Sequence, residues 1–411
     1  MPIEAEAPAR AAVEAVLRSS YGKLVAFLAA RTGDVAAAED AVAEAVATAL
    51  AHWPKEGMPR SPEAWLSAVA RRRFIDQARR RHSATVAADH LRLIAEELAA
   101  DSETEIPDHR LALMFACAHP ALDAGIRAPL ILQTILGLDA SRIAAAFLIS
   151  PAAMGQRLAR AKSKIRQAGI PFRVPERAEL GERLDSVLEA IYAAFAEGWS
   201  DPTGNEIRRR ELAEEAIWLG RLVTSLMPDE PEALGLLALM LHAEARRKSR
   251  RDPSGEYVPL AAQDTALWDD RLIDEAEALL LRAGDMGVIG RFQLEAAVQS
   301  AHAVRRRTGR SDWPAIRLLY DALWTVTRSA VVAINRAVAI AETEGPSAGI
   351  AALDALAGDS RLAEYQPYWA ARASLLAALG AGDAAEEALT QAIGLEHDPA
   401  VRRFLERKRL R

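Results

Sequence analysis

The sequence predicts an all-α protein, with two small helical domains followed by a larger helical-repeat domain. Aromatic residues make up only 5% of the chain, while Ala and Leu dominate it, which favours helices over sheets. Apolar residues recur at helical spacing through most of the 411 residues. Segments rich in Pro and Gly interrupt this pattern at intervals that suit paired helices.

The first predicted domain covers residues 10–82. A turn signal at 31–34 divides residues 11–52 into two helices, the second of which is acidic on one side. A loop with three prolines is expected at 54–62. Ser61 and Pro62 then form the cap and first turn of a helix that runs to about residue 82 and ends in a basic cluster.

Residues 83–107 are predicted to be a partly helical linker, and residues 108–170 a second helical domain. Within this domain, Asp139 is the expected cap of one helix, and Ser150 with Pro151 begins the next. Four apolar residues of that next helix recur at helical spacing and are expected to pack inward: Met154, Leu158, Ala161 and Ile165. This pattern is typical of a helix-turn-helix.

The second helix of this pair has the composition of a helix that reads duplex DNA. Its first turn is small enough to approach base edges, and no acidic residue occurs between 151 and 170. Gln156 and Arg157 suit base edges, whereas the other cations suit phosphates. The candidate DNA contacts are Ala152, Ala153, Gln156, Arg157, Arg160, Lys162 and Lys164. The alternative is a helical hairpin with a solvated basic face.

The helix at 62–82 is a candidate for binding opened DNA. Arginine side chains can follow a single-stranded backbone, and an aromatic ring can stack on a base. The candidate residues are Trp65, Arg71, Arg72, Arg73, Arg79, Arg80 and Arg81. Two alternatives stay open: Trp65 can be a core residue, and a basic amphipathic helix can also bind RNA or anionic lipid.

Residues 177–411 form the predicted C-terminal extension, which a proline-punctuated junction at 169–176 separates from the second domain. Its amphipathic segments and regular breaks indicate a helical-repeat array. Residues 368–399 come nearest to a TPR unit, with Leu379-Gly380, Asp398-Pro399 and small residues at Ala384, Ala388 and Ala392. The alternative is an irregular all-α domain.

Three of these segments resemble the sigma-70 superfamily. Residues 33–50 resemble the helix that docks on the polymerase β′ clamp, which implies polymerase contacts by Glu39, Asp40 and Glu44. Residues 64–81 resemble the helix of group 4 sigma factors that reads the −10 element, with Arg72 in place of the usual asparagine. Residues 138–166 resemble the helix-turn-helix that reads the −35 element, with Arg142 where glutamate is common.

Further segments resemble the extracytoplasmic-function (group 4) subfamily that has a TPR-like C-terminal extension: FACAHPAL (115–122), GIPFRVP (169–175) and INRAVAIAE (334–342). The resemblance implies a sigma region 2 over 10–82 and a sigma region 4 over 108–170. It implies binding to core RNA polymerase through the β′ clamp and β subunits, recognition of promoter DNA at −35 and −10, and transcription initiation. It further implies that the extension regulates activity, by binding a protein or by contacting the sigma domains.

Other classes of protein are less compatible with the sequence. No apolar run approaches the ~18 residues of a membrane span, and the lone Cys117 excludes an internal disulfide, which together favour the cytoplasm. Neither a phosphate loop nor a metal-ligand motif is present, so we expect no enzyme activity, cofactor or metal, and we interpret Cys117 as a core residue. The net charge is −6, but the basic residues of the first two domains are clustered.

Two alternative functions remain at this point. A conventional transcription regulator, with a helix-turn-helix and a helical sensor domain, would bind DNA without polymerase. A TPR scaffold would bind proteins only. The regulator leaves residues 33–82 without a role, and the scaffold treats the basic helices as solvated faces.

Overall fold

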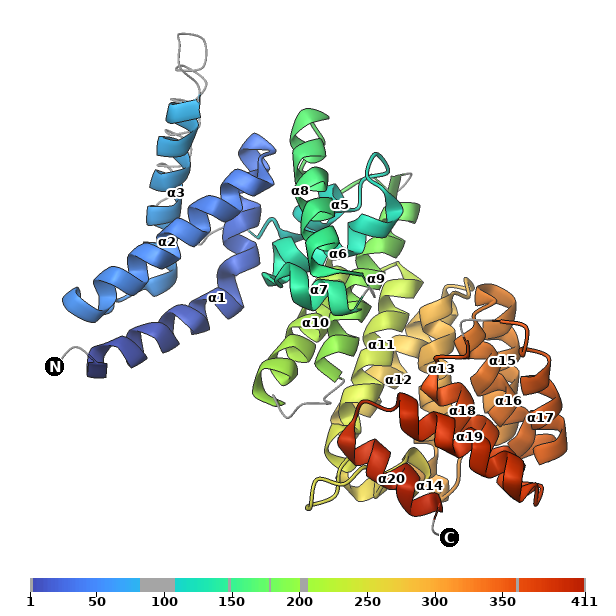
Figure 1. Ribbon diagram of the computed structural model, residues 1–411. Helices are drawn as coiled ribbons and strands as arrows, with labels where there is room; N and C mark the ends of the chain where they lie inside the picture. Colours follow the sequence, from blue (N-terminus) through green and yellow to red (C-terminus); the bar gives the residue numbers. More distant parts are fainter. Residues whose placement is uncertain are drawn as a thin grey trace. The chain divides into compact units, whose positions relative to one another are not determined.

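A computed structural model describes residues 3–81, 108–146, 149–176, 179–199, 206–359 and 362–409 (Figure 1). Over these residues the chain is helical and has no strand, apart from one isolated bridge between Arg251 and Tyr257. The all-α prediction is confirmed. The chain divides into two compact units, residues 1–194 (unit 1) and 195–411 (unit 2). The predicted domain boundaries stay predictions, and the predicted linker at 83–107 falls almost wholly outside the described residues.

Unit 1 contains the helices of both predicted sigma domains. They are α1 (Ile3–Thr32), α2 (Val35–Glu56), α3 (Pro62–Arg81), α5 (Arg110–Cys117), α6 (Ala124–Leu136), α7 (Ala140–Ala146) and α8 (Pro151–Gln167), and α9 (Leu180–Trp199) begins in this unit. The first three helices pack on one another, and α1 also packs on α5 and α6. The residues of the two predicted domains therefore share one compact body.

The turn predicted at 31–34 separates α1 from α2, as expected. The Asp34 side chain caps α2 by accepting a hydrogen bond from the Ala37 backbone N–H at 3.0 Å. The predicted loop at 54–62 is wrong at its start, because α2 continues through Pro54 to Glu56. The buried Trp53 side chain anchors this last turn, and Gly57 ends it with a φ of 86°.

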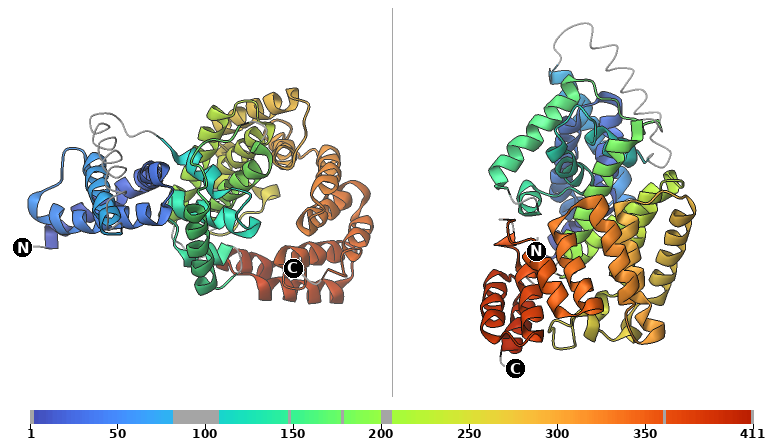
Figure 2. Two further views of the ribbon diagram at one scale, coloured as in Figure 1. Left: turned by 90° about the horizontal axis from the view of Figure 1, so that it is seen from above. Right: turned by 90° about the vertical axis from the view of Figure 1, so that its right-hand side faces the viewer.

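Unit 2 is a succession of helices that pack mainly on their neighbours along the chain, as in a helical-repeat protein (Figure 2). They are α10 (Glu206–Leu226), α11 (Pro231–Ala245), α12 (Asp270–Asp285), α13 (Arg291–Ala303), α14 (Arg305–Thr308), α15 (Trp313–Thr327), α16 (Ala330–Glu344), α17 (Pro346–Asp354), α18 (Gln366–Ala378), α19 (Gly382–Leu395) and α20 (Pro399–Arg409). Short 3₁₀ turns occur at Arg247–Ser249, Leu260–Ala262 and Thr265–Leu267.

The stretch at 368–399 forms most of α18 and all of α19. Ala388 and Ala392 are buried, as expected of small residues between packed helices. Ala384 is exposed, and its neighbour Ala385 is buried instead, because Ala385 lies one turn before Ala388 and two turns before Ala392 on the same side of α19. The helix pair exists, while its assignment as a TPR unit stays a prediction.

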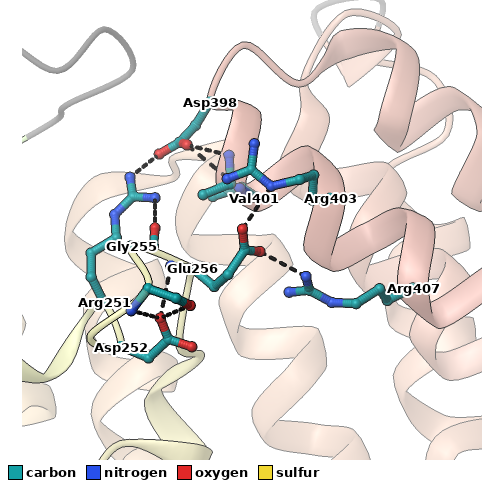
Figure 3. A network of polar contacts seen from close by, with 10 residues as sticks. Arg251, Asp252, Gly255, Glu256, Asp398, Val401, Arg403 and Arg407 are labelled. Atoms are coloured by element: carbon teal, nitrogen blue, oxygen red, sulfur yellow. Dashed lines mark hydrogen bonds and ion pairs between the residues drawn. The ribbon is translucent and has the colours of Figure 1, made fainter.

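The last helix of unit 2 returns to a hairpin that lies far away in the sequence. Arg251 forms an ion pair with Asp398 at 2.5 Å, and Glu256 forms ion pairs with Arg403 and Arg407 at 2.7 Å (Figure 3). The Tyr257 ring meets the Phe404 ring edge-on, with 5.4 Å between centroids. An open repeat array has only neighbour contacts, so this long-range contact closes unit 2 on itself.

None of the helices in the described ranges is both long and apolar enough to cross a bilayer.

Candidate DNA and polymerase interface

Helix α8 begins and packs as the sequence predicts. The Ser150 hydroxyl accepts a hydrogen bond from the Ala153 backbone N–H at 3.3 Å, and Pro151 takes the first helical position. Asp139 caps α7 by accepting bonds from the N–H groups of Ser141 and Arg142, both at 2.9 Å. All four residues that were expected to pack inward are buried: Met154, Leu158, Ala161 and Ile165. Their burial fixes which side of α8 faces solvent.

Most of the candidate DNA contacts on α8 lie on its solvent side. Ala152, Gln156, Arg157, Arg160 and Lys164 are exposed, and Ala153 is half-buried. Three of these cations also line a surface cavity of about 450 Å³, whose lining is Leu122, Asp123, Ile126, Arg157, Arg160, Ala161 and Lys164. The exposed guanidinium and ammonium groups can therefore reach an anionic partner such as a phosphate backbone.

Lys162 differs from the other cations of α8. Its Nζ lies 2.6 Å from Oε2 of Glu39 on α2, and both side chains are largely buried, with exposed fractions of 14% and 13%. One turn further on, Arg166 forms an ion pair with Asp34 at 3.2 Å. The structure thus places Lys162, which was predicted to face solvent and phosphate, in a pair with another site residue. The sequence shows no sign of this pair, because its members are 123 positions apart.

The predicted polymerase-binding residues of α2 fall into two environments. Asp40 and Glu44 are exposed, and Glu44 lies 3.7 Å from Arg73 of α3. Glu39 is enclosed, and the Tyr21 hydroxyl donates a hydrogen bond to its carboxylate. Burial raises the pKa of the Glu39 carboxyl, and the Lys162 ammonium opposes that rise.

Two of the candidate DNA-melting residues of α3, Trp65 and Arg71, make packing contacts. Trp65 is half-buried and meets the buried Trp53 edge-on, with 5.4 Å between ring centroids, which supports its interpretation as a core residue. Arg71 lies over the Phe27 ring at 5.3 Å, while Arg72 is exposed. The side chains of Arg79, Arg80 and Arg81 lie outside the described residues.

Cys117 is a core residue, as the sequence indicates. Its thiol is fully buried and lies 3.6 Å from the Thr134 hydroxyl. Burial raises the pKa of this thiol to about 12, so it carries no thiolate near neutral pH.

Two protein families each match one part of this chain, and one relative matches most of it. Residues 16–84 match the family described as Sigma-70 region 2, and residues 183–284 match a family of unknown function (DUF6596). The chain is 40% identical over 370 residues to the uncharacterized protein R00370 of Rhizobium meliloti (strain 1021), which covers 87% of this chain and 86% of that protein. No solved structure matches the chain significantly.

The region 2 match bears on the alternative functions. It covers residues 33–82, the segment for which a conventional regulator offers no role and in which a TPR scaffold has only a solvated basic face. The same residues form α2 and α3, which hold the acidic and basic side chains described above. The chain belongs to one family with the Rhizobium meliloti protein, and its region 2 match over residues 16–84 supports a sigma-70 family factor.

Proposed function

We propose that this protein is an extracytoplasmic-function (group 4) sigma factor with a TPR-like C-terminal extension. It binds core RNA polymerase, with α2 on the β′ clamp and further contacts to the β subunit. It recognises the −10 element with α3 and the −35 element with α8, and it directs transcription initiation in the cytoplasm. In this function it is not an enzyme and needs no cofactor.

The observation that carries this proposal is the solvent face of α8 in a chain that has a sigma-70 region 2. The buried apolar side of α8 leaves Gln156, Arg157, Arg160 and Lys164 exposed along one helix. Helix α7 packs against α8, so the pair supports a helix-turn-helix whose second helix enters the major groove. Arg157 suits a guanine edge, and Lys164 suits a phosphate.

Helix α3 supports the second DNA contact. Arg72 is exposed on it, and Arg73 can exchange its ion pair with Glu44 for a phosphate. The half-buried Trp65 serves mainly to hold α3 against α2. Melting of the −10 element is therefore assigned to the arginines rather than to this indole.

The C-terminal unit is proposed to regulate this activity, by binding a partner protein or by contacting the sigma domains. Its run of packed helices supports this, because helical-repeat arrays present extended binding surfaces. Run-off transcription by the full chain and by a chain that ends at residue 176 tests the idea. Equal output from the two chains contradicts it.

In vitro transcription with purified core polymerase on a promoter library tests the main proposal. We expect polymerase-dependent transcripts from a subset of promoters that share −35 and −10 elements. DNA binding that is independent of polymerase, without transcripts, would instead identify a conventional regulator. The absence of both would leave a protein-binding scaffold.

A further inference from the structure

Three arginines of unit 2 lie in one region and bond only to uncharged acceptors. Arg246 follows the end of α11, Arg250 follows the next 3₁₀ turn, and Arg305 begins α14. Arg246 donates to the side-chain oxygen of Gln299 at 2.5 Å and to a backbone carbonyl oxygen at 3.3 Å. Arg250 donates to one backbone carbonyl oxygen, at 2.9 Å, and Arg305 to two. Within the described ranges, none of the three forms an ion pair with a carboxylate.

The acidic side chains of this region are already paired with other arginines. Glu244 of α11 lies 2.8 Å from Arg247. Asp398, which is close to Arg250, pairs with Arg251 at 2.5 Å. Two aspartates of α12 both pair with Arg306, at 2.6 Å. The described side chains therefore leave three guanidinium charges of this region without a counter-charge.

These three charges lie close enough to repel one another. Burial, and then the positive charges of Arg250 and Arg305, lower the pKa of Arg246 to about 10. The dipole of α11 favours a cation at its C-terminal end, which accounts for Arg246, but Arg305 comes from another helix. Enclosing cations without a counter-charge costs free energy. An anion bound among them would remove that cost and stabilise unit 2.

Aromatic rings and a buried polar contact hold the guanidinium groups in place. Arg250 lies over the Trp199 ring, 4.3 Å from its centroid, and Arg305 lies over the Trp268 ring at 5.3 Å. The Trp268 indole N–H in turn donates to the Ser249 hydroxyl at 3.0 Å, and both of these residues are buried. The arginines therefore keep their orientation without a ligand, so little order has to be gained when an anion binds.

Hydrogen-bond donors are available in this region. Arg246, Arg250 and Arg305 are half-buried, so part of each side chain reaches solvent. Arg247 also lies over the Trp199 ring, at 4.9 Å, and its buried Nη2 atom has no hydrogen-bond partner among the described residues. A buried donor of this kind is costly unless an acceptor arrives.

The arrangement favours one class of anion. Several guanidinium charges without a counter-charge suit an anion with more than one negative charge, and the planar guanidinium fork fits the oxygens of a phosphate group. A nucleic-acid backbone is contacted best by fully exposed cations such as Arg157 and Arg160 of α8. The recessed cations of unit 2 suit a phosphate group carried by a small molecule.

We propose that Arg246, Arg250 and Arg305 form a binding site for the phosphate group of a small molecule, with Arg247 as a further donor. The site lies wholly within unit 2. It does not depend on the sigma function proposed for this chain, and it gives the C-terminal unit a ligand of its own.

Calorimetric titration of the full-length protein with inorganic phosphate tests the site. Sodium chloride keeps the ionic strength constant, and the phosphate stays dilute because concentrated phosphate stabilises proteins in general. Arg250→Gln removes one guanidinium group and is expected to weaken phosphate binding by roughly tenfold or more. Arg307→Gln is the matched control, because it removes the same charge from an exposed position on α14. It is expected to bind phosphate as the wild type does.

A second variant and a second measurement separate binding from folding. Arg250→Lys keeps the positive charge but loses the fork, so its affinity is expected to lie between those of the wild type and Arg250→Gln. The rise in melting temperature on adding phosphate is measured for each protein against its own phosphate-free value. A variant that is less stable than the wild type therefore still reports on binding.

The source of the phosphate group is tested by titrating glycerol phosphate beside inorganic phosphate. Tighter binding of the ester supports a site for a phosphorylated metabolite, whereas equal binding supports a site for the phosphate group alone. If the wild type binds neither, or if Arg250→Gln and Arg307→Gln bind phosphate equally, the proposal is wrong. Binding of only a phosphoserine peptide or duplex DNA also contradicts it. Phosphate binding by a protein that fails to bind core polymerase would refute the sigma function and leave this site standing.

Discussion

The basic side chains of α8 differ in what they can contact, although all of them lie on the same helix. Arg157 and Lys164 are exposed, whereas Lys162 is enclosed in its pair with Glu39. The helical period that buries Met154 and Leu158 decides this division, because it directs each cation either to solvent or towards α2. The sequence predicts one role, a phosphate contact, for both Lys162 and Lys164, although only Lys164 is exposed.

The first prediction concerns two of these exposed cations. Arg157→Ala is expected to weaken binding to the cognate −35 element by about 1–3 kcal/mol and to relax specificity at one base, because a bidentate guanidinium–guanine contact is lost. Lys164→Ala is expected to weaken binding to all sequences alike and to lower the salt dependence, because a phosphate contact is lost. Titration of holoenzyme on matched and mutated promoters at several salt concentrations measures both. Wild-type affinity in both variants would contradict the assignment of α8.

At the scale of elements, the start of α8 depends on local chemistry that the sequence reveals. Ser150 caps the helix and Pro151 occupies its first turn, as a Ser-Pro dipeptide before an amphipathic run predicts. The end of α2 shows the opposite case. Pro54 was expected to begin a loop, yet the helix continues for two more residues because Trp53 is buried. Tertiary packing here overrides a local signal.

The second prediction tests the cap of α8. Ser150→Ala leaves the Ala153 backbone N–H without its acceptor, which costs about 1 kcal/mol of helix stability. Hydrogen exchange in the first turns of α8 should accelerate, and urea denaturation should show the matching loss. Ser150→Asp restores an acceptor and is expected to return exchange to the wild-type rate. Equal exchange in all three proteins would show that the cap does not stabilise α8.

On the scale of the molecule, unit 2 combines neighbour-by-neighbour packing with one long-range closure. The hairpin around residues 251–257 and helix α20 are far apart in sequence, yet ion pairs and an aromatic contact join them (Figure 3). Unit 2 also buries His242 and half-buries His302, whose ring meets the Trp313 ring edge-on. Both features affect the stability of the whole unit rather than of one helix.

The third prediction follows from the closure of unit 2. Glu256→Gln removes the charge that pairs with Arg403 and Arg407, so α20 should detach more often and its amides should exchange faster. Glu406→Gln changes the same charge at an exposed site on α20 and serves as the control. Hydrogen exchange measured by mass spectrometry compares the α20 amides of the two variants. Equal exchange in both variants would show that the pairs contribute nothing to the closure.

The fourth prediction concerns the stability of unit 2 in acid. Burial lowers the pKa of His242 to about 3 and that of His302 to about 4, so both stay neutral in the folded unit. The unfolded chain takes up protons below about pH 6.5, so stability should fall as the pH decreases from there. The slope should be about 1.4 kcal/mol per pH unit for each histidine.

Calorimetry between pH 7.5 and pH 5 (roughly the range in which only unfolded histidines titrate) measures this slope. His302→Gln removes the contribution of one of the two histidines. The slope of stability against pH should therefore be halved, whatever the effect of the substitution on stability at neutral pH. A slope that the substitution leaves unchanged would contradict the burial of this imidazole in solution.

The sequence by itself determined the helical class, most helix starts and the buried face of α8, because caps, breaks and apolar periodicity act within a few residues of one another. It also identified the sigma-like segments from short motifs in a fixed order. Only the tertiary structure decided that Lys162 pairs with Glu39 and that Gly22 of α1 packs closely against α6. It also decided that α20 contacts the hairpin around residues 251–257. These contacts join residues far apart in the chain, and no local pattern specifies which distant partner a side chain meets.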